Sequence, residues 1–338
     1  MNIGWGVVGV LAGGLLNGSF VAPMKRMSRW QWENTWLVYS VAGFLLIPWL
    51  TAFATVPHLL SIFQQCSLSV LVRVVLFGLG WGVGSVLFGL GVNRLGLAVG
   101  YGIILGLIAP IGTFLPLVVL HPERLWTSQG YALMAGTALV LTGIFLLAVA
   151  GKSREKESTT LAPMVQAGFL GGLIICVFAG IFSPMLNFSF VFGQELHEKA
   201  LSSGAAIGMA SNAIWCLTLT AGFLVNIGYC IFLLAKNNTW GLFTRSDLPA
   251  SYWLAGCLMG LLCFGSFLAY GMGATALGSL GGIVGWPLFM SMSLITSNSL
   301  GALTGEWKGS GARSHIYSAV GLALLVIAIV VISRGGGG

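Results

Sequence analysis

Acidic side chains are scarce in this chain, and each is a candidate for binding and releasing a proton. There are eight, and none falls in the middle of a long apolar stretch: Glu33, Glu123, Glu155, Glu157, Glu195, Glu198, Asp247 and Glu306. Glu33 is the strongest candidate, because "WQWENTW" surrounds it with tryptophans and apolar surroundings favour a neutral carboxyl group. Its alternative is an ordinary acid at a helix N-terminus within an aromatic belt. Glu198, beside His197, is the second candidate, with a solvated loop pair as its alternative.

Neutral hydrogen-bonding side chains are more frequent in the apolar stretches, and their types suit a ligand rich in hydroxyl groups. An asparagine amide both donates and accepts hydrogen bonds, and a tryptophan or tyrosine face matches the apolar face of a sugar ring. Each such residue has a plain alternative, a hydrogen bond that links two helices. Trp215 and Asn226 are further aromatic or amide side chains within the apolar stretches. We predict substrate contacts at eight positions: Asn17, Trp81, Ser85, Tyr101, Asn187, Asn212, Tyr270 and Trp286.

Sequence signals for catalysis, metal binding and nucleic-acid binding are missing. The six cysteines form no CxxC pair, the four histidines fall in or near expected loops, and nothing resembles a P-loop or a nucleophile elbow. The net charge of +7 belongs to loops and requires no nucleic-acid partner. We therefore expect no metal, no cofactor and no enzymatic activity, since a membrane enzyme needs catalytic residues that face one another within its spans.

The overall composition predicts an all-α integral membrane protein. Of the 338 residues, 57% are hydrophobic and only 7% are charged, which is too few charges to cover a soluble domain. A bilayer core of about 30 Å needs about 20 apolar residues per helix, and the runs are too long for barrel strands. Ten spans are predicted near 3–23, 34–55, 68–91, 97–119, 130–150, 165–187, 205–235, 251–272, 276–303 and 315–333.

The distribution of basic residues predicts how these spans are oriented. The odd-numbered loops contain most of the lysines and arginines, including Lys25, Arg26 and Arg29 in the first loop. Positively charged loops face the cytoplasm, so the odd loops are expected there and both termini outside.

Two short patterns recur and predict an internal repeat. "FGLGVNRLG" at 88–96 returns as "YGMGATALG" at 270–278, and "NGSFVAPMK" at 17–25 returns as "AGIFSPMLN" at 179–187. Each pair falls at an equivalent position in a count of five spans plus five. Residues 1–150 and 165–338 are therefore predicted to be two five-helix repeats, joined by a polar linker at 151–164. Chance similarity between glycine-rich membrane helices is the alternative.

An odd number of helices per repeat predicts that the two halves are inverted relative to each other. Inverted repeats are typical of secondary transporters, whose substrate binds near the bilayer midplane where the halves meet. Prolines interrupt the apolar runs at Pro23, Pro110, Pro116, Pro184 and Pro287. Each proline frees a carbonyl group one turn earlier, and that carbonyl must meet a cavity or a neighbouring side chain.

Several stretches resemble the L-rhamnose–proton symporter family, within the drug/metabolite transporter superfamily of ten-helix carriers. They are "VAPMKRMSRWQWENTW", "FGLGWGVGSVLFGLGVNRLGLAVG", "FAGIFSPMLNFSF", "LVNIGYCIFLLAK" and "GEWKGSGAR", and they span nearly the whole chain. The resemblance implies a bacterial inner-membrane permease that imports a deoxy-hexose or related monosaccharide with a proton. It also implies polar and acidic residues before the tryptophan of the ninth helix. Here "GSLGGIVGWPLFMSMSLITSNS" has no charge, which leaves the sugar and the proton-coupling site open.

These observations together predict a multi-pass carrier of the bacterial inner membrane. It imports a small neutral sugar by alternating access, together with protons, and its partners are the sugar, protons and the lipid bilayer. The alternative is an uncoupled facilitator, or an exporter of another metabolite or drug.

Overall fold

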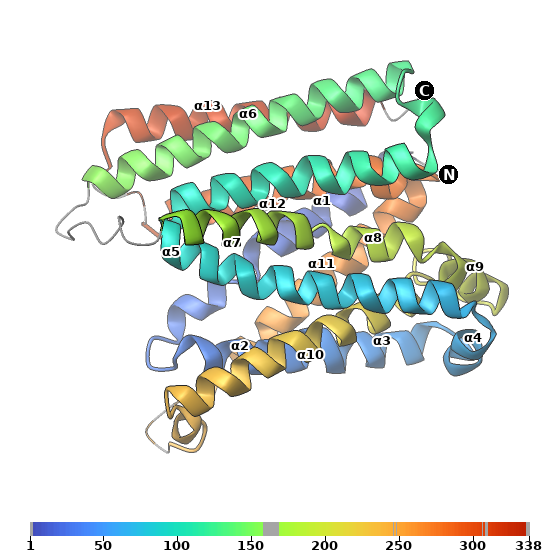
Figure 1. Ribbon diagram of the computed structural model, residues 1–338, viewed down its shortest axis with the longest axis horizontal. Helices are drawn as coiled ribbons and strands as arrows, with labels where there is room; N and C mark the ends of the chain where they lie inside the picture. Colours follow the sequence, from blue (N-terminus) through green and yellow to red (C-terminus); the bar gives the residue numbers. More distant parts are fainter. Residues whose placement is uncertain are drawn as a thin grey trace.

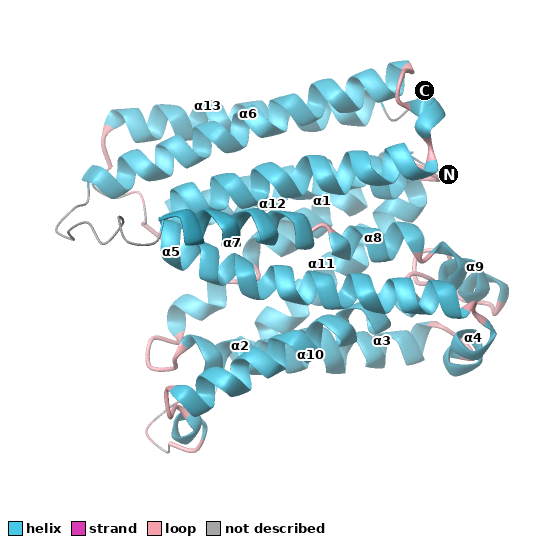
Figure 2. Ribbon diagram, in the orientation of Figure 1, coloured by secondary structure: helices cyan, strands magenta, loops and turns pink. Residues whose placement is uncertain are grey.

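The protein folds into a bundle of long helices. The computed structural model describes residues 3–157, 169–245, 247, 249–305, 307 and 310–335, and these contain no strand (Figures 1 and 2). The predicted all-α membrane architecture is therefore confirmed for the described part of the chain.

The first predicted span is a helix that ends before a proline. Helix α1 (Ile3–Ser19) is followed by a 3-10 turn, η1 (Ala22–Arg26), which has Pro23 in its first turn. The second span is continuous but contains a π-helical turn. It consists of α2 (Trp32–Ser40), η2 (Val41–Leu46) and α3 (Ile47–Thr55), and the short helix α4 (Leu59–Gln65) follows it.

Helix α5 (Leu68–Leu120) folds back on itself near the predicted turn at 88–96. Its backbone is assigned as helical over 53 residues, yet a methyl group at Gly100 would lie 3.0 Å from the Val92 Cα atom. A straight helix would separate positions eight residues apart by about 12 Å. The two arms, Leu68–Val92 and Ile103–Leu120, are each long and apolar enough to cross a membrane. The short η3 (Pro122–Arg124) and then α6 (Ser128–Glu157) complete this half, so helix continues into the predicted linker.

The second half also has a helix broken at a proline. Helix α7 (Phe169–Phe182) ends just before Pro184, and α8 (Met185–Phe192) and α9 (Gln194–Ser202) follow. Next come α10 (Asn212–Lys236) and the 3-10 turn η4 (Trp240–Phe243). The last three helices are α11 (Ser251–Leu277), α12 (Gly281–Leu303) and α13 (Ala312–Gly335). Gly278, at the end of the repeated motif, has a φ of 91° and makes the turn from α11 to α12.

Nine segments of the described residues are long and apolar enough to cross a bilayer. The predicted ninth span corresponds to α12, which is 23 residues long but is not one of the nine. Most of its side chains are buried against other helices, and its second half is rich in serine, threonine and asparagine. The ten-helix arrangement and its division into two inverted repeats therefore remain predictions.

Helix α1 packs closely against both α11 and α12. A methyl group at Gly9 would lie 2.9 Å from the Gly273 Cα atom, so two glycines let α1 and α11 come into backbone contact. At the edge of the bundle, α6 and α13 pack along each other (Figure 1).

Candidate functional site

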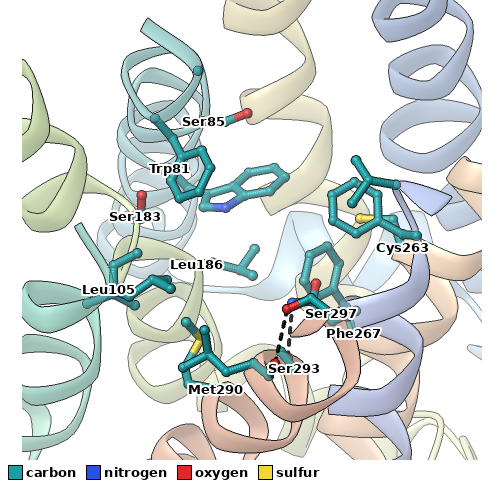
Figure 3. A pocket seen from close by; sticks show the side chains of 18 of the residues that line it. Trp81, Ser85, Leu105, Ser183, Leu186, Cys263, Phe267, Met290, Ser293 and Ser297 are labelled. Atoms are coloured by element: carbon teal, nitrogen blue, oxygen red, sulfur yellow. Dashed lines mark hydrogen bonds between the residues drawn. The ribbon is translucent and has the colours of Figure 1, made fainter. Parts of the chain in front are cut away.

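A cavity of about 530 Å³ lies among α1, η1, α2, both arms of α5, the α7–α8 break, α11 and α12. Its volume falls in the range of small-molecule sites. Val21, just before η1, and Met24, within η1, both line the cavity. Because Val21 is exposed, the cavity reaches the end of the bundle where α2 begins. Figure 3 shows Trp81 and Ser85 on one side and Met290, Ser293 and Ser297 on the other.

One wall is a stripe of α12 that combines hydroxyl groups with aromatic rings. Positions 286, 289, 290, 293, 294 and 297 all line the cavity, at the spacing that puts residues on one helix face. Asn17 of α1 donates from Nδ2 to the Ser293 hydroxyl at 3.1 Å, and Ser293 donates to the Phe289 carbonyl oxygen at 2.8 Å. This wall therefore offers an amide and two serine hydroxyls, at 293 and 297, beside apolar rings.

The opposite wall is held in place by a buried asparagine of α10. Asn226 accepts at Oδ1 from Trp36 Nε1 at 3.0 Å and from the Ser85 hydroxyl at 3.1 Å. Its own amide group donates to the Gly222 carbonyl oxygen at 2.9 Å, and the side chain is fully buried. Asn226 thus fixes two cavity side chains without lining the cavity itself. Trp81, beside them, packs edge-on against Phe44 and Phe267.

The described residues that line the cavity include no aspartate, glutamate, lysine, arginine or histidine. Its polar groups are amides, hydroxyls, a thiol and indole nitrogens. Such a lining can hydrogen-bond an uncharged molecule that has hydroxyl groups, whereas a charged molecule would find no counter-charge among these side chains.

The cavity is closed at the other end by a hydrogen-bonded cluster around Asn187. The fully buried Asn187 amide donates to the carbonyl oxygens of Gly112 and Gly282, both at 3.0 Å. The Tyr270 hydroxyl donates to Asn187 Oδ1 at 2.6 Å and lies 3.1 Å from the Gly282 oxygen. Helix α8, the second arm of α5, α11 and α12 are therefore tied together at one point.

Prolines explain why this cluster forms where it does. Pro116 has no N–H group, so the Gly112 carbonyl one turn earlier has no partner within α5, and Asn187 supplies one. Pro184 interrupts the helix between α7 and α8. As a result, Ser183 and Leu186 line the cavity and Asn187 lies just beyond it. Beneath the cluster, Phe190 and Trp215 stack at 5.4 Å.

The eight predicted contact residues divide into four groups. Asn17, Trp81, Ser85 and Trp286 line the cavity. Asn187 and Tyr270 lie in the closed end instead, and their side chains are saturated by one another and by backbone groups. Asn212 lies at the start of α10, outside the cavity lining, and donates to Thr55 Oγ1 at 2.9 Å. The side chain of Tyr101 falls outside the described part of the structure.

Neither of the two predicted proton-coupling acids lines the cavity. Glu33 is only 3% exposed, and its carboxylate accepts hydrogen bonds from Asn237 Nδ2 and the Thr239 hydroxyl, both at 2.9 Å. These bonds hold the loop after α10 against the start of α2, and they stabilise the charged form of the carboxyl group. Glu198 is exposed on α9. Glu33 directly follows Trp32, which does line the cavity, so a change at Glu33 could reach the cavity through the start of α2.

The predicted contact residues included neither the serines of α12 nor the buried Asn226. Ser293 and Ser297 stand four residues apart and follow Trp286 by seven and eleven, so the i, i+4, i+7 spacing could have identified them. The partners of Asn226 could not be inferred, because they come from two helices distant in sequence.

Similarity to known proteins agrees with this architecture. A family model described as L-rhamnose-proton symport protein (RhaT) matches residues 1–337. The chain belongs to this family. Membership identifies it as a transport protein of a sugar–proton symporter family rather than an enzyme, and as a multi-pass protein of the bacterial inner membrane.

Curated relatives and a solved structure match over nearly the full length. The L-rhamnose-proton symporters of Salmonella typhi and Salmonella gallinarum are each 27% identical to the chain, over 343 and 341 residues. Both alignments cover 99% of this chain and 97% of the relative. A crystal structure of a protein that is 16% identical has a TM-score of 0.56, and the match covers 96% of this chain and 95% of that one. That likeness concerns the fold alone.

Proposed function

We propose that the protein imports a small neutral monosaccharide together with protons, by alternating access, and that L-rhamnose is the first candidate. The observation that carries the proposal is the cavity of about 530 Å³, which reaches one end of the bundle and is closed at the other. Its lining of amide, hydroxyl and aromatic groups suits a ring with hydroxyls on its edge and an apolar face. The relatives named for L-rhamnose supply the candidate substrate.

The open end of the cavity faces the cytoplasm in this proposal. The loop that contains Lys25, Arg26 and Arg29 lies at that end, and positively charged loops are retained inside. The structure then corresponds to a carrier that is open inward, and the cluster of Asn187 and Tyr270 is its closed outer gate. The halves 1–150 and 165–338 are two inverted five-helix repeats, and they supply the two sides that rock around the cavity.

Proteoliposomes test this proposal. The purified protein should accumulate labelled L-rhamnose above the external concentration when the lumen is more alkaline than the outside. Equal uptake with and without the gradient would support an uncoupled facilitator instead. A thermal-shift panel of neutral monosaccharides identifies the preferred sugar, since a ligand raises apparent stability by RT ln(1 + [L]/Kd). A panel in which no sugar raises the unfolding temperature would contradict sugar binding.

A further inference from the structure

The described residues that line the cavity include no aspartate, glutamate, lysine, arginine or histidine, so a proton that affects transport near neutral pH must act on another part of the protein. The described helices contain two buried carboxyl or imidazole side chains that do not line the cavity, Glu33 and His197. Glu33 lies at the open end, where its hydrogen bonds stabilise the charged form. His197 lies on α9, and α9 and the start of α2 are at opposite ends of the bundle (Figure 1).

His197 is linked by hydrogen bonds to the helix that closes the cavity. Its ring is 6% exposed, and Nδ1 lies 3.1 Å from the Ser211 hydroxyl. The Ser211 oxygen lies 3.5 Å from the Thr275 hydroxyl of α11. A methyl group at Gly271 would be 3.4 Å from the Ser211 Cβ atom, so the same serine also packs against α11 next to Gly271, the residue that follows Tyr270. One short chain of side chains therefore runs from α9 to α11, the helix that supplies Tyr270 of the outer gate.

We infer that His197 is a protonation-controlled latch on the outer gate. In the tautomer with its proton on Nε2, the neutral ring accepts the Ser211 hydroxyl proton at Nδ1, and this bond holds α9 against the start of α10 beside Thr275 of α11. A proton from the outer solution turns Nδ1 into a donor, so the hydrogen bond between His197 and Ser211 must reverse direction. It also places a positive charge in a buried site whose partners are neutral hydroxyls. The closed arrangement is then less favourable than one in which α9 moves outward and the ring is hydrated.

The charged side chains near His197 do not compensate for a positive charge on its buried imidazole ring. Glu198 is the acid nearest to it in electrostatic terms, and it is exposed to solvent, where screening weakens the attraction. Glu195 is engaged by Ser67 and lies 3.9 Å from Lys199 on the same helix. The two helices packed on α9 add no charge nearby. α4 has no ionisable side chain, and the first ionisable group of α10 is the buried thiol of Cys216.

The latch rests on the proposed function for its role in transport, but its structural part can be tested without any sugar. Hydrogen–deuterium exchange of the α9 amides in detergent, corrected for the intrinsic pH effect, should rise as the pH falls from about 8 to about 5.5. This window brackets the ordinary imidazole pKa of about 6.5. The rise should disappear in His197→Gln and persist in His121→Gln, a matched change in the loop before η3. Equal acid-induced exchange in wild type and His197→Gln would overturn the latch.

Transport supplies the second readout. Exchange of labelled for unlabelled L-rhamnose, with no proton gradient, should accelerate several-fold as both solutions are acidified, and His197→Gln should show a flat pH profile with exchange retained. If His197→Gln does not fold, Ser211→Ala replaces it, and its exchange rate at alkaline pH should approach the acidic wild-type rate. A wild-type profile in Ser211→Ala would overturn the latch. A wild-type protein that exchanges no L-rhamnose at any pH contradicts the proposed function, and the α9 amide measurement then decides the latch alone.

Discussion

The Asn187 side chain donates a hydrogen bond of 3.0 Å to the Gly112 carbonyl oxygen, the group that Pro116 leaves without a partner in its own helix. A helix defect in the second arm of α5 is thereby repaired by a residue of α8, 75 positions away in sequence. Because the same amide also binds Gly282 and Tyr270, the repair joins four helices where the cavity ends.

Replacing Asn187 by leucine should destabilise the closed end. The change keeps the branching of the side chain but leaves the buried Gly112 carbonyl oxygen without a partner, at about 1–3 kcal/mol for an unsatisfied group, while the Tyr270 hydroxyl keeps only the Gly282 carbonyl oxygen as its acceptor. Thermal unfolding in detergent should therefore occur at a clearly lower temperature. Asn298→Leu is the matched control, because the Asn298 amide bonds only to Leu294 in its own helix. Equal losses in the two variants would show that Asn187 has no special structural role.

Glycine at 112 should be required for the position of Trp286. A methyl group there would lie 2.1 Å from Trp286 Nε1, an impossible contact that must push the indole out of its hydrogen bond to the Ile108 oxygen. We expect Gly112→Ala to lose about 1–3 kcal/mol of stability and to take up L-rhamnose poorly. Gly106→Ala, in the same arm, meets nothing within 4 Å and should match the wild type. Normal uptake by Gly112→Ala would mean that Trp286 does not shape the site.

Removing the Asn226 side chain should weaken sugar binding from a distance. Asn226→Ala frees Trp36 and Ser85, so the cavity wall loses its fixed orientation while every lining residue remains. The expected rise in the dissociation constant for L-rhamnose is roughly three- to ten-fold, equivalent to about 1 kcal/mol. Asn212→Ala, on the same helix but outside the cavity lining, should leave the affinity unchanged. Unchanged affinity in Asn226→Ala would remove it as a positioning residue.

Acid should loosen the contact between the first loop and the segment before α11. Hydrogen bonds from Arg245 and then Arg29 hold the pKa of Asp247 at about 2, below its ordinary value of 3.8. A carboxyl group with a lowered pKa in the folded state stabilises the fold above its unfolded pKa of about 4, and this contribution is lost as the pH falls from about 4 to about 2. The unfolding temperature of Asp247→Asn should lack that part of the acid dependence. Both partners are half exposed, so the effect is small.

The sequence was informative about the fold because each of its signals is local. Apolar runs, the proline at 184 and the glycine at 278 act within one helix or turn, so most spans and breaks could be placed to within a few residues, although the sixth span extends to Ser202 and the seventh begins at Asn212. The cavity was predicted only in part, because whether an asparagine faces a cavity or another helix depends on which helix lies opposite. Asn17 and Asn187 occur in the matching stretches of the predicted repeat, yet one lines the cavity and the other closes it.

Binding of labelled L-rhamnose to the purified protein with and without the Asn17 side chain tests the central claim most directly. The account predicts saturable binding to the wild type, and a dissociation constant about ten-fold higher in Asn17→Ala, since an amide lost from a sugar site costs about 1–2 kcal/mol. Asn298→Ala, further along α12, should bind as the wild type does. Equal affinity in Asn17→Ala and wild type would contradict a sugar site in the cavity between α1 and α12.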